Sequence, residues 1–164
     1  SLIKTETDGY KQTKAVGFSA NITTSQSSTW TGVTYYHITN DTTYNNTLGI
    51  VWTENWSYPN SSIFDDGKFI CPVDGLYKVY ANIRFDNVSQ FIRIIISINK
   101  NTSYIKQLHN TQKAINSNYE TINISGTIQL FKNDIVTIVF QVLNTLTFEI
   151  SEESSFSIIL INAN

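Results

Sequence analysis

Apolar residues in this chain recur at every second position, and this spacing limits the possible folds more than any other feature. A period of two places alternate side chains on opposite faces of a β-strand, whereas a helix requires a period of about 3.6. Between Leu76 and Asp86, for example, the apolar set is Tyr77, Val79, Ala81, Ile83 and Phe85. The same rhythm recurs in segments 91–99, 121–130, 135–142, 147–151 and 156–162. No segment has the pattern of a capped amphipathic helix, and the stretch 103–118 is left unassigned.

The residues between these segments are typical of turns. Clusters of Asn, Asp, Ser and Gly, such as Asp65-Asp66-Gly67, separate segments rich in Ile, Val, Thr, Tyr and Phe. Many short strands at turn-bounded intervals predict an all-β fold, an antiparallel sandwich or jelly roll. A length of 164 residues is ordinary for one domain, so we expect a single sandwich.

Several predicted strands are apolar on both faces. In an antiparallel sheet with one solvated face, apolar and polar residues should instead alternate along each strand. The residues on their second face are Ile95, Val139, Ile159 and Ile161. Because the sequence offers no helix as a cover, we expect another copy of the same sheet to cover these four residues. The alternative is that loops of the same chain cover them.

The composition limits the partners and the compartment. Only 15% of the residues are charged and the formal net charge is −2, which argues against a nucleic-acid binder. No apolar run approaches the 18 residues of a transmembrane helix. The single cysteine, Cys71, cannot form an internal disulfide, and we interpret it as a small half-buried hydrophobic residue. Eight Asn-x-Ser/Thr sequences permit a glycosylated extracellular protein without requiring one.

The sequence offers little to a catalytic mechanism. His37 and His109 are the only histidines, and they do not form a ligand-spaced pair. Neither a Gly-x-Ser-x-Gly nucleophile motif nor a phosphate-binding Gly-rich loop occurs. We therefore expect no enzymatic activity and no cofactor. The one metal alternative is calcium bound by loop carboxylates, because hard cations prefer such ligands; the candidates are Asp65, Asp66 and Asp74.

One stretch resembles the signature of a known family. Residues 66–79 resemble the Gly-x-Phe-x-x-Pro-x-x-Gly-x-Tyr run of C1q-like globular heads, which are relatives of tumour necrosis factor. Further segments resemble this family in the same order, at 15–20, 94–99, 125–136 and 154–160. The residues that carry the resemblance are Phe18, Gly67, Phe69, Pro72, Gly75, Tyr77, Gly126, Asp134 and Phe156.

The resemblance implies a ten-stranded antiparallel jelly roll that assembles as a trimer around a threefold axis. The domain would occupy residues 15–164. Residues 1–14 would be an N-terminal extension or stalk remnant, and the missing initiator Met fits a head cut from a longer fibre.

The signature residues have structural roles in this reading. We expect Gly67 and Gly75 to take positive φ angles in tight turns, and Tyr77 and Phe156 to fill the core. Asn133 stands where the family usually has Gly, which is tolerable because Asn accepts a left-handed conformation.

Segment 21–49 is longer than the usual connection of the family, and we expect it to be an insertion specific to this protein. Tyr and Trp dominate binding hot spots and stack on sugars, so its aromatic part is a candidate recognition surface. The candidate ligand-binding residues are Trp30, Tyr35, Tyr36, His37 and Tyr44. The alternative is an extra hairpin whose Trp30 and Tyr36 cap the sandwich.

Together these features predict a non-enzymatic homotrimeric recognition head of a fibre or stalk, which binds a cell-surface receptor or glycan multivalently. We expect it outside the cell or on a particle surface: secreted, or on a virion, phage fibre or spore. The alternatives are a structural trimerisation cap without a ligand and a secreted cytokine-like ligand. A glycan hydrolase on a jelly roll is a third alternative.

Overall fold

The structure is a computed structural model that describes residues 2–5, 9–12, 15–30, 34–41, 49–88, 92–100, 107–115, 118–142 and 145–163. For residues 2–5, 9–12, 34, 92–100 and 107–115 the description covers the backbone alone.

Most of the described residues are in β-strands, as the period of two predicts. The strands are β1 (Leu2–Thr5), β2 (Gly9–Gln12), β3 (Gly17–Ile22), β4 (Gln26–Trp30), β5 (Thr34–His37), β6 (Trp52–Tyr58), β7 (Phe64–Asp65), β8 (Lys68–Ile70), β9 (Gly75–Asp86), β10 (Ile92–Lys100), β11 (Gln107–Ile115), β12 (Tyr119–Leu130), β13 (Ile135–Val142), β14 (Leu146–Ile150) and β15 (Ser155–Ala163). One turn of 3-10 helix, η1 (Ser61–Ile63), precedes β7. The described part of the chain contains no helix with the length and apolar character needed to cross a membrane.

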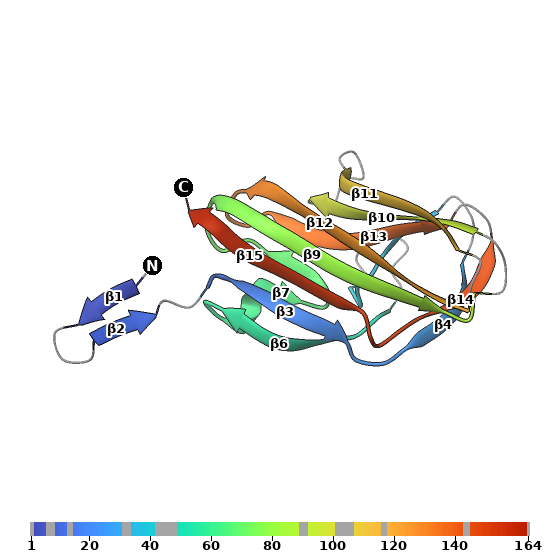
Figure 1. Cartoon of the computed structure of the whole chain (residues 1–164), viewed down its shortest axis with the longest axis horizontal. Helices are drawn as coiled ribbons and strands as arrows, with labels where there is room; N and C mark the ends of the chain where they lie inside the picture. The colour runs from blue at the N-terminus through green and yellow to red at the C-terminus, as the bar shows by residue number, and fades with distance from the viewer. Residues whose placement is uncertain are drawn as a thin grey trace.

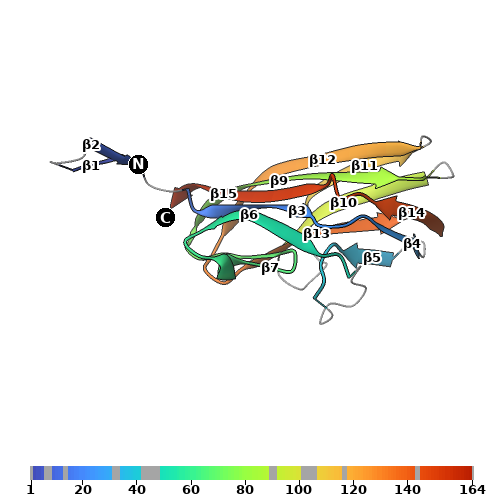
Figure 2. The same cartoon turned by 90° about the horizontal axis from the view of Figure 1, so that it is seen from below.

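Two antiparallel sheets face each other and form the sandwich (Figure 1 and Figure 2). The seven-stranded sheet has the order β4-β14-β9-β15-β3-β6, with β12 paired to β9. The six-stranded sheet has the order β11-β10-β13-β8-β7, with β5 paired to β13. Strands β1 and β2 form a separate two-stranded sheet beyond the end where the C-terminus lies (Figure 1). The all-β antiparallel jelly roll expected from the sequence is confirmed.

Alternation along single strands builds the core between the two sheets. In β9 the five apolar residues expected to point inward are all 0% exposed. Aromatic rings fill the middle of the core: Phe18 stacks on Phe64 with ring centroids 4.3 Å apart, and Phe156 meets Phe18 edge-on at 4.8 Å. Tyr77 is also 0% exposed, so the core roles expected of Tyr77 and Phe156 are confirmed.

The turn residues agree with the sequence expectations in two of three cases. Gly67 has a φ of +90°, and Asn133 takes a left-handed φ of +72°. The expectation for Gly75 is wrong, because its φ does not lie in the positive region. Gly75 is instead needed for close packing: a Cβ there would lie 2.5 Å from Leu160 Cδ1 and 2.6 Å from the carbonyl oxygen of Asn162.

The described strands of segment 21–49 do not pair with each other as an extra hairpin. Its two described strands after β3 belong to different sheets, because β4 pairs with β14 and β5 pairs with β13. The segment therefore crosses from one sheet to the other near the end of the sandwich far from the two termini (Figure 2). Trp30 and Tyr36 meet inside this end with ring centroids 5.4 Å apart.

Candidate functional site

The outer face of the seven-stranded sheet keeps large apolar side chains in contact with solvent. Trp56 is 39% exposed, Tyr80 is 43% exposed, Ile159 is 40% exposed and Ile161 is 54% exposed. We call these four residues the exposed face. Apolar area of this kind on a regular sheet is typical of a surface that binds another protein.

Strand alternation explains why these side chains point outward. Val79 and Ala81 are both 0% exposed, so Tyr80 between them must point away from the core. Ile158 is 0% exposed in the same way, which directs Ile159 outward. Ile161 lies where the pairing of β15 with β9 shifts register, and no partner in β9 stands opposite it.

The strand register places the two aromatic residues of the exposed face, Trp56 and Tyr80, in one row across the sheet. This row runs across β6, β3, β15, β9 and β12 and consists of Trp56, Ser19, Ser157, Tyr80 and Ser125. Trp56 and Tyr80 are three strand spacings apart, about 14 Å, and only serines stand between them. In this row, small polar residues therefore lie between the two large aromatic ones.

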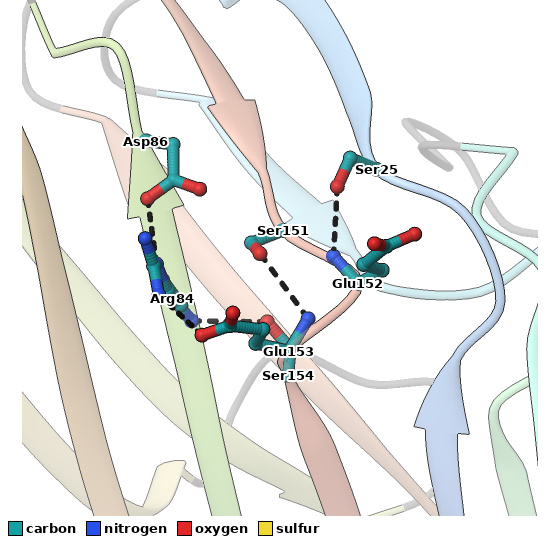
Figure 3. Close-up of polar contacts among 7 residues, drawn as sticks. All are labelled: Ser25, Arg84, Asp86, Ser151, Glu152, Glu153 and Ser154. Carbon is teal, nitrogen blue, oxygen red and sulfur yellow. Dashed lines mark hydrogen bonds and ion pairs between the residues drawn. The ribbon is translucent and has the colours of Figure 1, made fainter.

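Charged residues close the end of the sheet toward the turn between β14 and β15 (Figure 3). Arg84 Nε lies 2.7 Å from Asp86 Oδ1, and Arg84 also forms an ion pair with Glu153. Its guanidinium lies 4.8 Å from the ring centroid of Tyr119. The hydrogen bond to Asp86, more than any other contact, raises the pKa of Arg84. The positive charge of Arg84 is therefore compensated within the chain.

Serine hydroxyls fix the turn that carries these acidic residues (Figure 3). Ser151 Oγ accepts a hydrogen bond from the Glu153 backbone N–H at 3.1 Å, and Ser25 Oγ accepts one from the Glu152 N–H at 2.9 Å. The Arg84 N–H donates to Ser154 Oγ at 2.9 Å. These hydrogen bonds hold the charged residues in place at one end of the exposed face.

Of the four residues expected at an interface between copies, Ile95, Val139, Ile159 and Ile161, those whose side chains are described differ in their exposure to solvent. Ile159 and Ile161 are exposed, as an interface residue must be in a single protomer. The expectation for Val139 is corrected, because Val139 is 0% exposed within one chain. Its outward-facing neighbours on β13, Thr137 and Gln141, are also buried, so the chain covers this face itself. The side chain of Ile95 lies outside the described residues.

The structure also corrects two of the candidate ligand-binding residues. Trp30 is 4% exposed, because its ring packs among Tyr36, Phe140 and Phe148. His37 is 1% exposed, and burial lowers its pKa to about 4. Neither side chain is available to a ligand on the surface of the protomer.

The other candidate ligand-binding residues stay a prediction. Tyr35 and Tyr36 are half-buried on β5. Tyr44 lies outside the described residues.

Sequence reasoning missed Trp56 and Tyr80. The alternation that identified Tyr77 and Val79 as inward residues also implies that Tyr80 points outward, so a signal was present. Trp56 lies in β6, whose burial pattern does not alternate regularly, and a bulge opposite Ser19 and Ala20 interrupts its register. Local spacing therefore gave no indication of where Trp56 points.

Two of the three loop carboxylates considered for calcium, Asp65 and Asp74, are engaged with protein groups. Asp65 lies 3.2 Å from Lys68 Nζ, and Asp74 Oδ1 accepts a hydrogen bond from the Lys132 N–H at 2.7 Å. Across the part of the chain that the structure describes, no three His, Cys, Asp or Glu side chains gather as a metal site. Cys71 is buried, and burial raises the pKa of its thiol.

Comparisons with known proteins relate this geometry to one family. A sequence profile of the TNF (Tumour Necrosis Factor) family matches residues 52–161. The crystal structure of murine APRIL at pH 5.0 superposes on this chain with a TM-score of 0.57 and 12% sequence identity. The match covers 90% of this chain and 100% of the APRIL chain, and at this identity it shows a shared fold. The comparison with curated proteins found no match.

Proposed function

Because the chain belongs to the TNF (Tumour Necrosis Factor) family, we propose that it is a non-enzymatic recognition head that works as a homotrimer. Proteins of this family are non-enzymatic ligands that form homotrimers and bind receptors on cell surfaces. They are secreted or displayed outside the cell. The resemblance to C1q-like heads found in the sequence agrees with this membership.

The observation that carries the trimer is the exposed face. Trp56, Tyr80, Ile159 and Ile161 stay partly exposed on a sheet whose opposite side packs into the core. Burying this area against other copies removes apolar surface from water, which is the main favourable term in protein association. The low content of charged residues, 15%, fits a chain that shares part of its surface with two copies.

We further propose that residues 1–14 continue into a stalk and that the opposite end of the sandwich makes the recognition contacts. The N-terminal hairpin and the C-terminus lie at one end, and β5 with Tyr35 and Tyr36 lies toward the other (Figure 2). A trimer presents three copies of any such contact, so weak single contacts add by avidity. The head would then sit on a fibre at a virion, phage or spore surface, with a receptor or glycan as its ligand.

The second candidate is a secreted cytokine-like ligand without a fibre, which the family membership supports directly. A structural cap that holds three stalk strands in register and binds nothing is the third.

Two measurements test the proposal. Light scattering should give three times the chain mass of 18.6 kDa at micromolar concentration. A monomeric mass would refute the trimer. Labelled trimer should then bind cells or a glycan array, and Tyr35→Ala should weaken this binding while Phe131→Ala, at the opposite end, leaves it unchanged. A trimer that binds neither cells nor glycans would refute the recognition role and leave the cap.

A further inference from the structure

The Asn-x-Ser/Thr sequences play no part in the proposed function, yet each has the form of an acceptor for N-linked glycosylation. Four of them lie wholly within the described residues and begin at Asn21, Asn55, Asn60 and Asn123. Three of these four lie on strands β3, β6 and β12 of the seven-stranded sheet, and the fourth lies in the connection that contains η1. Their positions therefore differ with respect to the exposed face.

Asn123 is an exposed side chain on the same side of the sheet as the exposed face. Its neighbours Ile122 and Ile124 are 1% and 2% exposed, so Asn123 must point outward. In the register Asn123 stands opposite Asn82 on β9, two residues along that strand from Tyr80. One strand spacing and two residue steps put the Cα atoms of Asn123 and Tyr80 about 8 Å apart. A glycan on Asn123 would therefore begin next to the exposed face.

A glycan at this position is incompatible with an interface between copies on this side of the sheet. Packed sheets lie about 10 Å apart, and side chains fill the space between them. An N-linked oligosaccharide is bulky, and its hydroxyl groups cost free energy when they are buried without hydrogen-bond partners. The folded protomer itself accommodates the glycan, because the side chain of Asn123 points away from the core.

The side-chain nitrogen atoms of Asn21 and Asn55 are engaged in hydrogen bonds. Asn55 Nδ2 donates to Asn21 Oδ1 at 2.6 Å, and Asn21 Nδ2 donates to the carbonyl of Ser154 at 3.4 Å. N-linked glycosylation joins the sugar to this nitrogen, so a glycan must displace or share these bonds. Asn21 is also half-buried. We therefore assign no glycan to either residue.

Asn60 lies away from the exposed face, in the connection from β6 to β7 of the other sheet. Tyr58, the last residue of β6, pairs with Gly17, where the chain enters the sandwich, so Asn60 lies at the end near the termini. The side chain of Asn60 is exposed and caps η1. Its Oδ1 accepts hydrogen bonds from the Ser62 N–H at 3.0 Å and from the Ser62 hydroxyl. Both bonds use the oxygen, so a sugar on the nitrogen leaves the cap in place.

On the basis of the proposed trimer, we propose that Asn60 and Asn123 are N-glycosylation sites with opposite effects on assembly. A glycan on Asn60 leaves the trimer intact. A glycan on Asn123 covers the exposed face and keeps the protomer monomeric. Modification of this one residue therefore controls whether the recognition head assembles.

The donor is an oligosaccharide carried on a lipid pyrophosphate. Asn Nδ2 forms a bond to C1 of the oligosaccharide, the bond from C1 to the pyrophosphate oxygen breaks, and the amide nitrogen gives one proton to a base of the transferase. The lipid pyrophosphate leaves with the electron pair of the broken bond. Secretion, which is typical of the family, exposes a chain to this reaction.

The intact chain secreted from insect cells tests the assignment, with the same chain made in the bacterial cytoplasm as the unglycosylated reference. Size-exclusion chromatography separates trimer from monomer. An amidase that removes N-linked glycans in heavy-oxygen water converts each occupied Asn into a labelled Asp, which mass spectrometry locates. Asn60 should be occupied in both fractions, whereas Asn123 should be occupied in the monomer and unoccupied in the trimer.

Two variants isolate the effect of the glycan on Asn123. Asn123→Gln removes the acceptor and should move the secreted protein from the monomer fraction to the trimer fraction. Asn60→Gln is the matched control, because it also removes one glycan from an exposed Asn, and it should leave the ratio of the two fractions unchanged.

Three results would overturn this assignment. The first is a trimer fraction in which Asn123 carries a glycan. The second is Asn60 or Asn123 without a glycan in every fraction. The third is an Asn123→Gln variant with the same share of monomer as the wild type. A monomer from the bacterial cytoplasm would instead refute the proposed trimer itself, and glycan control of assembly with it.

Discussion

Replacing two residues of the exposed face by serine should dissociate the proposed trimer without unfolding the protomer. The variant is Tyr80→Ser with Ile159→Ser. Serine already occupies the face at Ser19, Ser157 and Ser125, so these positions accept it on a strand of this sheet. The protomer core is untouched, because both side chains point away from it.

The size of the effect follows from the exposed fractions. Complete burial of a side chain of this size is worth roughly 2–3 kcal/mol. With 43% of Tyr80 and 40% of Ile159 still exposed in the protomer, each contributes about 1 kcal/mol when an interface covers it. Over three copies the double substitution removes about 6 kcal/mol, which is roughly four powers of ten in the dissociation constant of the trimer.

Sedimentation velocity over a concentration series measures this directly. The wild type should sediment as a trimer at concentrations where the variant sediments as a folded monomer. Phe131→Ser is the matched control, because Phe131 is 53% exposed but lies on the turn after β12, off the exposed face. If the double variant and the control dissociate at the same concentration as the wild type, the face does not form the interface and the reasoning fails.

Three further predictions concern the protomer. Gly17→Ala should lower the free energy of unfolding by about 4 kcal/mol and Tm by roughly 10 °C in a thermal melt. The reason is that Gly17 has a φ of +148° and that a Cβ there would overlap the carbonyl oxygen of Ile158. An unchanged Tm would contradict this geometry. Trp30→Phe should change the free energy of unfolding by less than about 1 kcal/mol in urea, because the buried Trp30 Nε1 has no hydrogen-bond partner among the described residues. Trp52→Phe should lower the free energy of unfolding by about 1–3 kcal/mol more than Trp30→Phe does, because it breaks a hydrogen bond to a buried carbonyl. Equal effects of the two substitutions would argue against this bond. Arg84→Gln should lower Tm in dilute buffer, and the difference in Tm from the wild type should shrink in molar salt. The lost ion pairs are partly exposed, so salt screens them. A difference in Tm that does not depend on salt would point to packing instead.

Alternation along a strand is encoded locally, and this part of the fold could be predicted. Each residue of β9 sees mainly its own strand neighbours, so the inward set from Tyr77 to Phe85 follows from the spacing alone. The same reasoning placed Ile159 correctly on the outside. The left-handed turn at Asn133 followed from the conformational freedom of one residue type.

Contacts between distant segments could not be predicted in this way. Spacing shows that β13 is apolar on both faces, but it does not show whether a loop or a second copy covers Val139. The spacing within segment 21–49 does not show that β4 and β5 join different sheets, through partners more than 100 residues away. The burial of Trp30 and His37 depends on those pairings, so the sequence offered no means of distinguishing them from surface aromatic residues.

The position of the termini also determines how the domain bears load. The chain enters the sandwich through β3, at the same end as the C-terminus (Figure 1). β3 lies between β15 and β6, with antiparallel pairing on both sides. A pull between the N-terminus and a ligand held at the opposite end runs along β3, so it shears both ladders at once instead of unzipping them bond by bond. Since ladder hydrogen bonds stand perpendicular to the strands, they share such a force, and the domain is oriented to resist tension along its length.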